Sequence, residues 1–88
     1  MTWIIEFDPQ VEKDLKKLSQ KDKHRIFDFL ENRLSHFESP RQSGKPLKGK
    51  KLEIWRYRVG NHRLLCEIQD NVLRILVLKI GHRKEIYR

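Results

Sequence analysis

Residues 55–65 read W-R-Y-R-V-G-N-H-R-L-L and give the clearest structural signal in the chain. Arg56 and Arg58 alternate with aromatic and apolar residues, as in a strand whose successive side chains point to opposite faces. Gly60-Asn61 tolerates positive φ and predicts a hairpin turn that returns Arg63 beside the other two arginines. The stretch therefore predicts a β-hairpin with three guanidinium groups on one face.

The chain then continues through an apolar strand into I-G-H-R-K-E-I-Y at 80–87, which adds Arg83. A guanidinium group stays protonated and can donate two parallel N–H hydrogen bonds to the oxygens of a phosphate. A concave face with four of them indicates a polyphosphate ligand, and RNA is the polyphosphate we expect. The alternative is a row of solvated arginines paired with acids, for which Glu67 is available.

The first half of the chain predicts one strand and two helices. Residues 3–7 are rich in β-formers, and Asp8-Pro9 is a typical helix start. Ser19, with Asp22 three residues later, predicts the cap of a second helix. Apolar residues at helical spacing give each helix a buried stripe: Val11, Leu15 and Leu18 in the first, and Ile26, Phe29, Leu30, Leu34 and Phe37 in the second.

With strands at 52–59, 62–69 and 72–80, the element order is β-α-α-β-β-β. It predicts an α+β fold in which a helical hairpin packs on a small antiparallel sheet. The 88 residues make a single domain, 1–88, with a small core. The lone Cys66 excludes an internal disulfide and is expected in the core.

Charge is unevenly distributed. The net charge is +8. Residues 1–40 hold seven Lys/Arg and eight Asp/Glu, and residues 41–88 hold thirteen and four, so the net charges are −1 and +9. Such asymmetry favours a nucleic-acid surface, although high charge also keeps small proteins in solution. The loop 38–51 carries the lysines expected to bind RNA: Lys45, Lys48, Lys50 and Lys51.

Two further side chains are candidates for chemistry. His82 carries an imidazole that could transfer a proton, or it could simply orient or pack against a neighbour. Tyr87 could dock a ligand or, among cations, ionise more easily. The sequence has no metal-ligand cluster, no cofactor motif and no spaced pair of histidines or carboxylates, so a nuclease of this kind would be metal-free. No apolar run approaches the ~20 residues of a membrane span, and we expect a cytoplasmic protein.

The motifs F-D-P, P-L-K-G at 46–49, W-R-Y-R-V-G-N-H-R at 55–63 and I-G-H-R-K-E-I-Y together resemble the RelE/ParE superfamily of bacterial toxins. The RelE-type mRNA interferases look most similar. The resemblance implies a toxin of a type II toxin–antitoxin system that cuts mRNA in the ribosomal A site, where the 2′-hydroxyl attacks the adjacent phosphate. It implies three partners: a small acidic RelB-like antitoxin, mRNA, and the 30S subunit with its 16S rRNA.

The resemblance also implies roles for single residues. Arg56, Arg58 and Arg63 fall on the family's phosphate-binding positions, Arg83 on its proton donor and Tyr87 on its C-terminal tyrosine. Arg56 and Arg58 form an Arg-x-Arg pair where close relatives of the type member carry Lys-x-Lys. Because arginine is a poor general base, Tyr87 and His82 become the candidates for the general base. Two other functions remain open: a ParE-like toxin that inhibits DNA gyrase and cuts nothing, and an RNA-binding module without catalysis.

Overall fold

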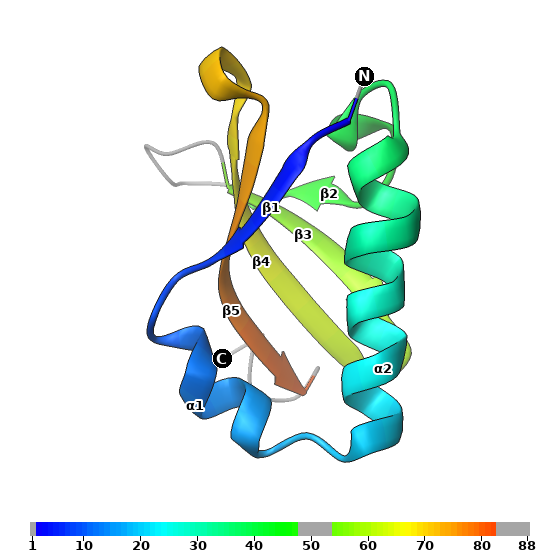
Figure 1. Ribbon diagram of the computed structural model, residues 1–88, viewed down its shortest axis with the longest axis vertical. Helices are drawn as coiled ribbons and strands as arrows, with labels where there is room; N and C mark the ends of the chain where they lie inside the picture. The colour runs from blue at the N-terminus through cyan, green and yellow to red at the C-terminus, as the bar shows by residue number, and fades with distance from the viewer. Residues whose placement is uncertain (1, 48–53, 83–88) are drawn as a thin grey trace.

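A computed structural model describes residues 2–47 and 54–82 of the chain. Figure 1 shows a sheet with one long helix crossing it and a second, short helix at its edge. The α+β class is confirmed. The elements in chain order are β1 (Ile4–Phe7), α1 (Val11–Lys16), α2 (Gln20–Asp28), β2 (Lys45–Pro46), β3 (Ile54–Val59), β4 (His62–Gln69) and β5 (Arg74–His82).

The sheet has five strands in the order β1-β5-β4-β3-β2. All neighbours are antiparallel except β1 and β5, which run parallel, so the prediction of an antiparallel sheet is wrong at this edge. Parallel neighbours need a long crossover, and the whole chain from α1 to β4 lies between these two strands. The residue pattern within a strand carries no information on its direction, which is why the sequence did not reveal this.

The two helices do not form one layer. α2 continues through a π-helical turn at Phe29–Arg33 and a 3₁₀ turn at Leu34–His36, and this long helix alone covers one face of the sheet. The helix α1 instead lies along β5 beyond the end of β1, where the Asp14 carboxylate accepts a hydrogen bond of 3.0 Å from the Ile80 backbone N–H. The short α1 thus covers an edge that β1 leaves unpaired.

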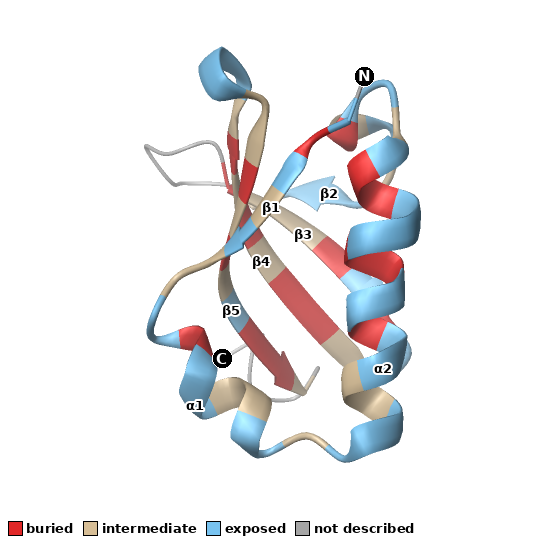
Figure 2. Ribbon diagram, in the orientation of Figure 1, coloured by how far each residue is buried: buried red, intermediate tan, exposed pale blue. Residues whose placement is uncertain are grey.

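The core lies between α2 and the sheet, and Figure 2 shows buried residues on the facing sides of both. Tyr57, Leu64 and Cys66 have no exposed surface, which confirms the core position predicted for the cysteine. Ser19 caps α2 as predicted, because its hydroxyl accepts a hydrogen bond of 3.1 Å from the Asp22 N–H. The apolar stripe predicted for the second helix is buried except at Phe37, which is half-buried.

The turn between β4 and β5 is longer than the predicted hairpin. Residues Asp70–Val72 form a 3₁₀ turn, and Leu73 follows in the left-handed region with a φ of 50°. Strand β5 therefore begins at Arg74 rather than at Val72. A left-handed leucine is uncommon, so this turn depends on contacts outside it, among them the ion pair of Asp70 with Arg41.

Candidate nucleic-acid interface

Four cations lie on the sheet face opposite α2. In the antiparallel register, Arg58 on β3 stands directly across from Arg63 on β4, and Lys45 on β2 stands across from Arg56. Partners in register share a face, and residues two apart on a strand do also. The clustering of Arg56, Arg58 and Arg63 predicted from the sequence is present, and Lys45 joins it.

Together with Gly44, these four cations line a hollow of about 240 Å³, which we call the arginine hollow. Like charges directly opposite one another in a sheet destabilise it. Here two such pairs, Arg58 with Arg63 and Lys45 with Arg56, lie side by side. An anion bound in the hollow would remove this repulsion, and the paired N–H groups of guanidinium match the oxygens of a phosphate.

Arg63 is held differently from its neighbours. Arg63 is only 6% exposed, whereas Arg58 is open to solvent. One Arg63 guanidinium nitrogen donates to the backbone carbonyls of His62 at 3.1 Å and Gly60 at 3.4 Å. The two-residue turn makes this possible, because Gly60 has a φ of 60° and brings its carbonyl back toward β4. Arg63 is therefore part of the structure of the hairpin as well as of the hollow.

The segment before β2 closes one side of the arginine hollow. The Tyr57 hydroxyl donates a hydrogen bond of 2.6 Å to the Pro40 carbonyl, and the Trp55 indole donates one of 2.6 Å to the Ser43 carbonyl. Burial raises the pKa of Tyr57, which keeps its hydroxyl a donor. Two aromatic side chains of β3 thus hold the segment that carries Gly44 and Lys45.

Gly44 is required where this segment meets β3. It has a φ of 75°, and a Cβ built on it would lie 2.5 Å from the Arg56 carbonyl oxygen and 2.8 Å from the Trp55 ring. No L side chain fits at this position without movement of the backbone. The close approach brings Lys45 into register with Arg56.

Arg41 ties the same segment to the distant turn between β4 and β5. Its guanidinium makes two hydrogen bonds to the Asp70 carboxylate, of 3.0 and 2.8 Å. The bond from Arg41 holds the pKa of Asp70 below its usual range. Neither Gly44 nor this ion pair was predicted from the sequence. Arg41 and Asp70 are 29 positions apart and give no local signal, and the role of Gly44 depends on its approach to β3.

His82 lies apart from the arginine hollow. It is paired with His62 at the end of the hairpin, and the two rings meet edge to face with centroids 6.0 Å apart. Because His62 precedes Arg63 on β4, the two histidines occupy the opposite face of the sheet. They line a different hollow, beside α1, with Asp14 and Lys17. Five further candidates lie outside the described residues: Lys48, Lys50, Lys51, Arg83 and Tyr87.

Within residues 2–47 and 54–82, no group of three or more His, Cys, Asp or Glu side chains is arranged to hold a metal ion. None of the helices in that part of the chain is long and apolar enough to cross a membrane.

Comparison with known proteins identifies the family. Residues 5–87 match the family described as the ParE toxin of the type II toxin-antitoxin system parDE. The chain belongs to this family. Within the wider RelE/ParE superfamily, Toxin RelG of Mycobacterium tuberculosis is 31% identical over 88 residues, which cover 100% of this chain and 99% of the relative. The predicted superfamily is confirmed, and the chain is a toxin of a type II toxin–antitoxin system.

Solved RelE/ParE structures share the fold. The toxin–antitoxin complex RelBE2 of M. tuberculosis contains a chain with a TM-score of 0.83 and 28% identity, over 94% of this chain and 93% of that one. The archaeal RelE–RelB complex of Pyrococcus horikoshii gives a TM-score of 0.76 and 27% identity, over 94% and 97%. Escherichia coli RelE, at 22% identity and a TM-score of 0.77 over 99% and 92%, shows the fold alone.

Proposed function

We propose that this toxin is a ribosome-dependent endoribonuclease that cleaves mRNA in the A site. One observation carries the proposal: Arg56, Arg58, Arg63 and Lys45 converge on a hollow on the sheet face opposite α2. A phosphodiester bound there would meet up to four cationic donors. As its phosphorus becomes pentacovalent it gains charge, and preorganised donors stabilise that charge more than they stabilise the ground state.

The reaction we propose needs no metal ion and proceeds in one displacement. The ribose 2′-hydroxyl loses its proton and its oxygen attacks the adjacent phosphorus, while the bond to the 5′-oxygen breaks and that oxygen takes up a proton. The products are a 2′,3′-cyclic phosphate and a 5′-hydroxyl. In this scheme Arg56, Arg58 and Arg63 hold the phosphate, Arg83 protonates the leaving oxygen, and Tyr87 orients or deprotonates the nucleophile.

His82 makes no direct contact with the phosphate in this scheme. Its side chain lies on the face opposite the arginine hollow, so a bound phosphate in the hollow would be out of its reach. We therefore propose Tyr87 as the residue that acts on the 2′-hydroxyl. The lysines Lys48, Lys50 and Lys51 follow Lys45 in the chain, and we propose that they extend RNA binding beyond the hollow.

The partners follow from the same proposal. The toxin would act in the cytoplasm, on mRNA held by the 30S subunit with its 16S rRNA. The neighbours from M. tuberculosis and P. horikoshii are complexes of RelE toxins with RelB antitoxins. We propose that a small acidic antitoxin of that kind binds this chain and masks its basic half.

Mapping of mRNA ends tests the proposal. After brief induction in cells, cuts at fixed positions within codons are expected, and they should disappear in the Arg56→Ala/Arg58→Ala variant. Intact mRNA in induced, growth-arrested cells would contradict the proposal.

The alternative candidate function is inhibition of DNA gyrase without cleavage of RNA. The description of the matched family as ParE of parDE favours it. The same induction experiment separates the two, because this function predicts intact mRNA together with DNA damage and the loss of gyrase supercoiling activity in vitro.

A further inference from the structure

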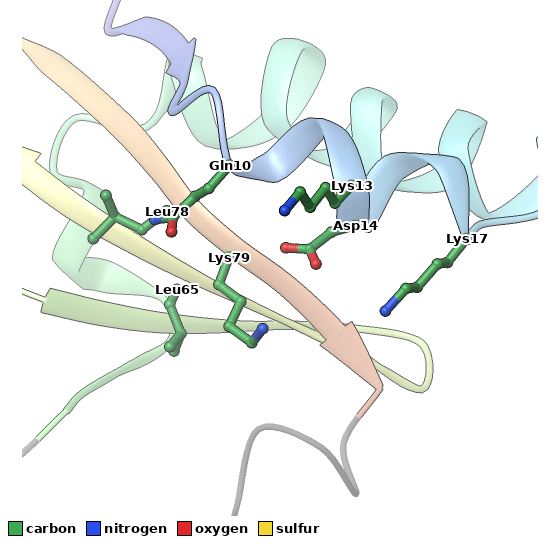
Figure 3. Close-up of a pocket in the computed structure, with 7 residues that line it drawn as sticks. All are labelled: Gln10, Lys13, Asp14, Lys17, Leu65, Leu78 and Lys79. Atoms are coloured by element: carbon green, nitrogen blue, oxygen red, sulfur yellow. The ribbon is translucent and has the colours of Figure 1, made fainter.

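A second basic hollow lies where α1 meets β5. It encloses about 520 Å³ and is lined by three lysines, Lys13, Lys17 and Lys79, together with Asp14 and two leucines. We call it the lysine hollow. Figure 3 shows Lys13 and Lys17 reaching from α1 toward the space that Lys79 enters from β5. The three lysines of this second basic site come from α1, its C-terminal cap and β5, which contribute nothing to the arginine hollow.

An irregularity in β5 places Lys79 in this hollow. Leu65 pairs with Lys79, but the next residue of β4, Cys66, pairs with Val77, so Leu78 is an extra residue on β5. Each such bulge reverses the alternation of faces along its strand. A regular strand would put Lys79 on the same face as buried Val77, under α2. The bulge turns the ammonium group to the other face.

That other face is the one that carries the arginine hollow. The register gives an unbroken row of cross-strand partners from β2 to β5: Lys45, Arg56, Leu65 and Lys79. Strands lie about 4.8 Å apart, so the backbones of Arg56 and Lys79 are about 10 Å apart. A few nucleotides of a single RNA strand span such a distance. The two hollows are successive positions on one path across the sheet.

The charges of the lysine hollow favour an anion. Its acid, Asp14, is engaged by the Ile80 N–H at 3.0 Å, where it closes the edge of β5. Within the described part of the chain, none of the three lysines has an ion-pair partner. Three ammonium groups against one engaged carboxylate repel one another, and a phosphate backbone would relieve that repulsion.

We infer that the lysine hollow binds backbone phosphates of the same RNA strand whose scissile phosphate occupies the arginine hollow. The inference rests on the proposed function and deepens it. It gives the bound RNA a path across the sheet, from β3 over Leu65 to β5 and α1. It also separates two tasks, since the arginines act on one phosphate and the lysines hold its neighbours.

Binding of two lengths of uncleavable RNA tests the inference. The ligands are a 2′-O-methyl dinucleotide, whose single phosphate can occupy only one hollow, and a nonanucleotide, which reaches both. The Lys13→Gln/Lys17→Gln/Lys79→Gln variant is compared with Lys16→Gln, an exposed lysine on the same helix that lines neither hollow. Affinities are measured by fluorescence anisotropy over a range of salt concentrations, and a thermal melt of each variant confirms folding.

The triple variant should bind the nonanucleotide about tenfold more weakly, and its log–log salt slope should fall by about 0.7 for each phosphate that it no longer neutralises. Its dinucleotide affinity should not change, and Lys16→Gln should resemble wild type with both ligands. Unchanged nonanucleotide affinity in the triple variant overturns the inference. It does so also when the triple variant binds the acidic antitoxin more weakly than wild type does. If the Arg56→Ala/Arg58→Ala variant also binds both RNAs with wild-type affinity, the proposed function fails as well. If that variant loses affinity for both RNAs, the proposed function stands but the lysine hollow has no part in it.

Discussion

Arg58 and Arg63 face each other across the hairpin but differ in what surrounds them. Arg58 is exposed, whereas Arg63 is buried and bound to two turn carbonyls. The first can be removed with little effect on the fold, and the second cannot. Variants of the two residues therefore separate the chemistry of the site from the stability of the hairpin.

The Arg58→Ala variant should lose activity and keep its stability. Loss of one preorganised donor to a transition state lowers the rate by about 10²–10³. Replacement of an exposed side chain changes the free energy of unfolding by about 0.5 kcal/mol or less. Single-turnover cleavage of A-site mRNA on programmed ribosomes, beside a urea titration, measures both. Lys16→Ala serves as the exposed-cation control, and wild-type cleavage by Arg58→Ala would remove this residue from the site.

The Arg63→Ala variant should lose both activity and stability. It removes the buried guanidinium and its part-buried hydrogen bonds to the carbonyls of His62 and Gly60. The loss of hydrogen bonds from a charged donor costs about 1.5–3 kcal/mol. Arg63→Lys, which keeps the charge and the aliphatic stem, should recover part of the stability but not the paired hydrogen bonds. Urea unfolding of the two variants measures this difference, and equal stability of Arg63→Ala and wild type would contradict the structural role of the buried guanidinium.

At the scale of elements, the segment that leads into β2 shapes the arginine hollow. Aromatic side chains of β3 hold it from the α2 side, and Arg41 holds it from the turn after β4. Each of these contacts joins residues distant in the sequence. The position of Lys45 therefore depends on side chains that do not themselves line the arginine hollow.

Gly44→Ala should displace this segment. The added Cβ would lie 2.5 Å from the Arg56 carbonyl, in a backbone conformation unfavourable to alanine. Such strain costs about 1–3 kcal/mol unless the segment moves. If it moves, Lys45 leaves the hollow and RNA affinity falls. Anisotropy and urea unfolding should both change, whereas the neighbouring Ser43→Ala keeps the backbone carbonyl that accepts from Trp55 and should change neither. Normal stability and normal affinity in Gly44→Ala would show that the close approach has no consequence.

The ion pair between Arg41 and Asp70 should give the fold a pH-dependent contribution. The folded pKa of Asp70 is lowered, so its stabilising effect is complete above the unfolded value of about 3.9 and is lost as the pH falls through the folded value. Because the Asp70 side chain is 57% exposed, the effect should not exceed about 1 kcal/mol. Wild type minus Asp70→Asn, measured by urea unfolding, should be constant near neutrality and vanish in acid. A difference that grows in acid would contradict this sign.

The sequence predicted these elements unequally, for physical reasons. The hairpin of β3 and β4 was predictable because alternation and the Gly60-Asn61 turn are local signals. Strand β2 has two residues and depends on how closely Gly44 approaches β3, which is a tertiary contact. The parallel placement of β1 and the bulge at Leu78 depend on pairing between distant segments. Local patterns therefore located the three clustered arginines, while Lys45's place among them and the burial of Arg63 required the structure.

At the scale of the whole molecule, the charge asymmetry has a structural counterpart. Of the net charge of +9 in residues 41–88, the described residues carry +5, and six of their seven Lys/Arg lie on β2, β3, β4 and β5. The helix α2 occupies one face of this sheet, and the arginine and lysine hollows open on the other. The fold thus gathers cations on one face of the sheet and uses α2 to form the core on the other.

This arrangement predicts that free RNA is bound but scarcely cut. The arginine hollow supplies phosphate ligands, and none of the groups that line it is a strong base at neutral pH, so cleavage must wait for an RNA held with its 2′-hydroxyl in line with the phosphorus. Holding reactants in attack geometry can contribute about 7–11 kcal/mol, enough to separate an idle enzyme from an active one. Binding should also weaken steeply with salt, by about 0.7 log units per neutralised phosphate for each decade. The purified toxin is compared on one mRNA with and without 70S ribosomes, with EDTA in the naked-RNA control. Rapid, sequence-selective cleavage of naked RNA would show a complete active site in the isolated chain, and the dependence on the ribosome would then have to be abandoned.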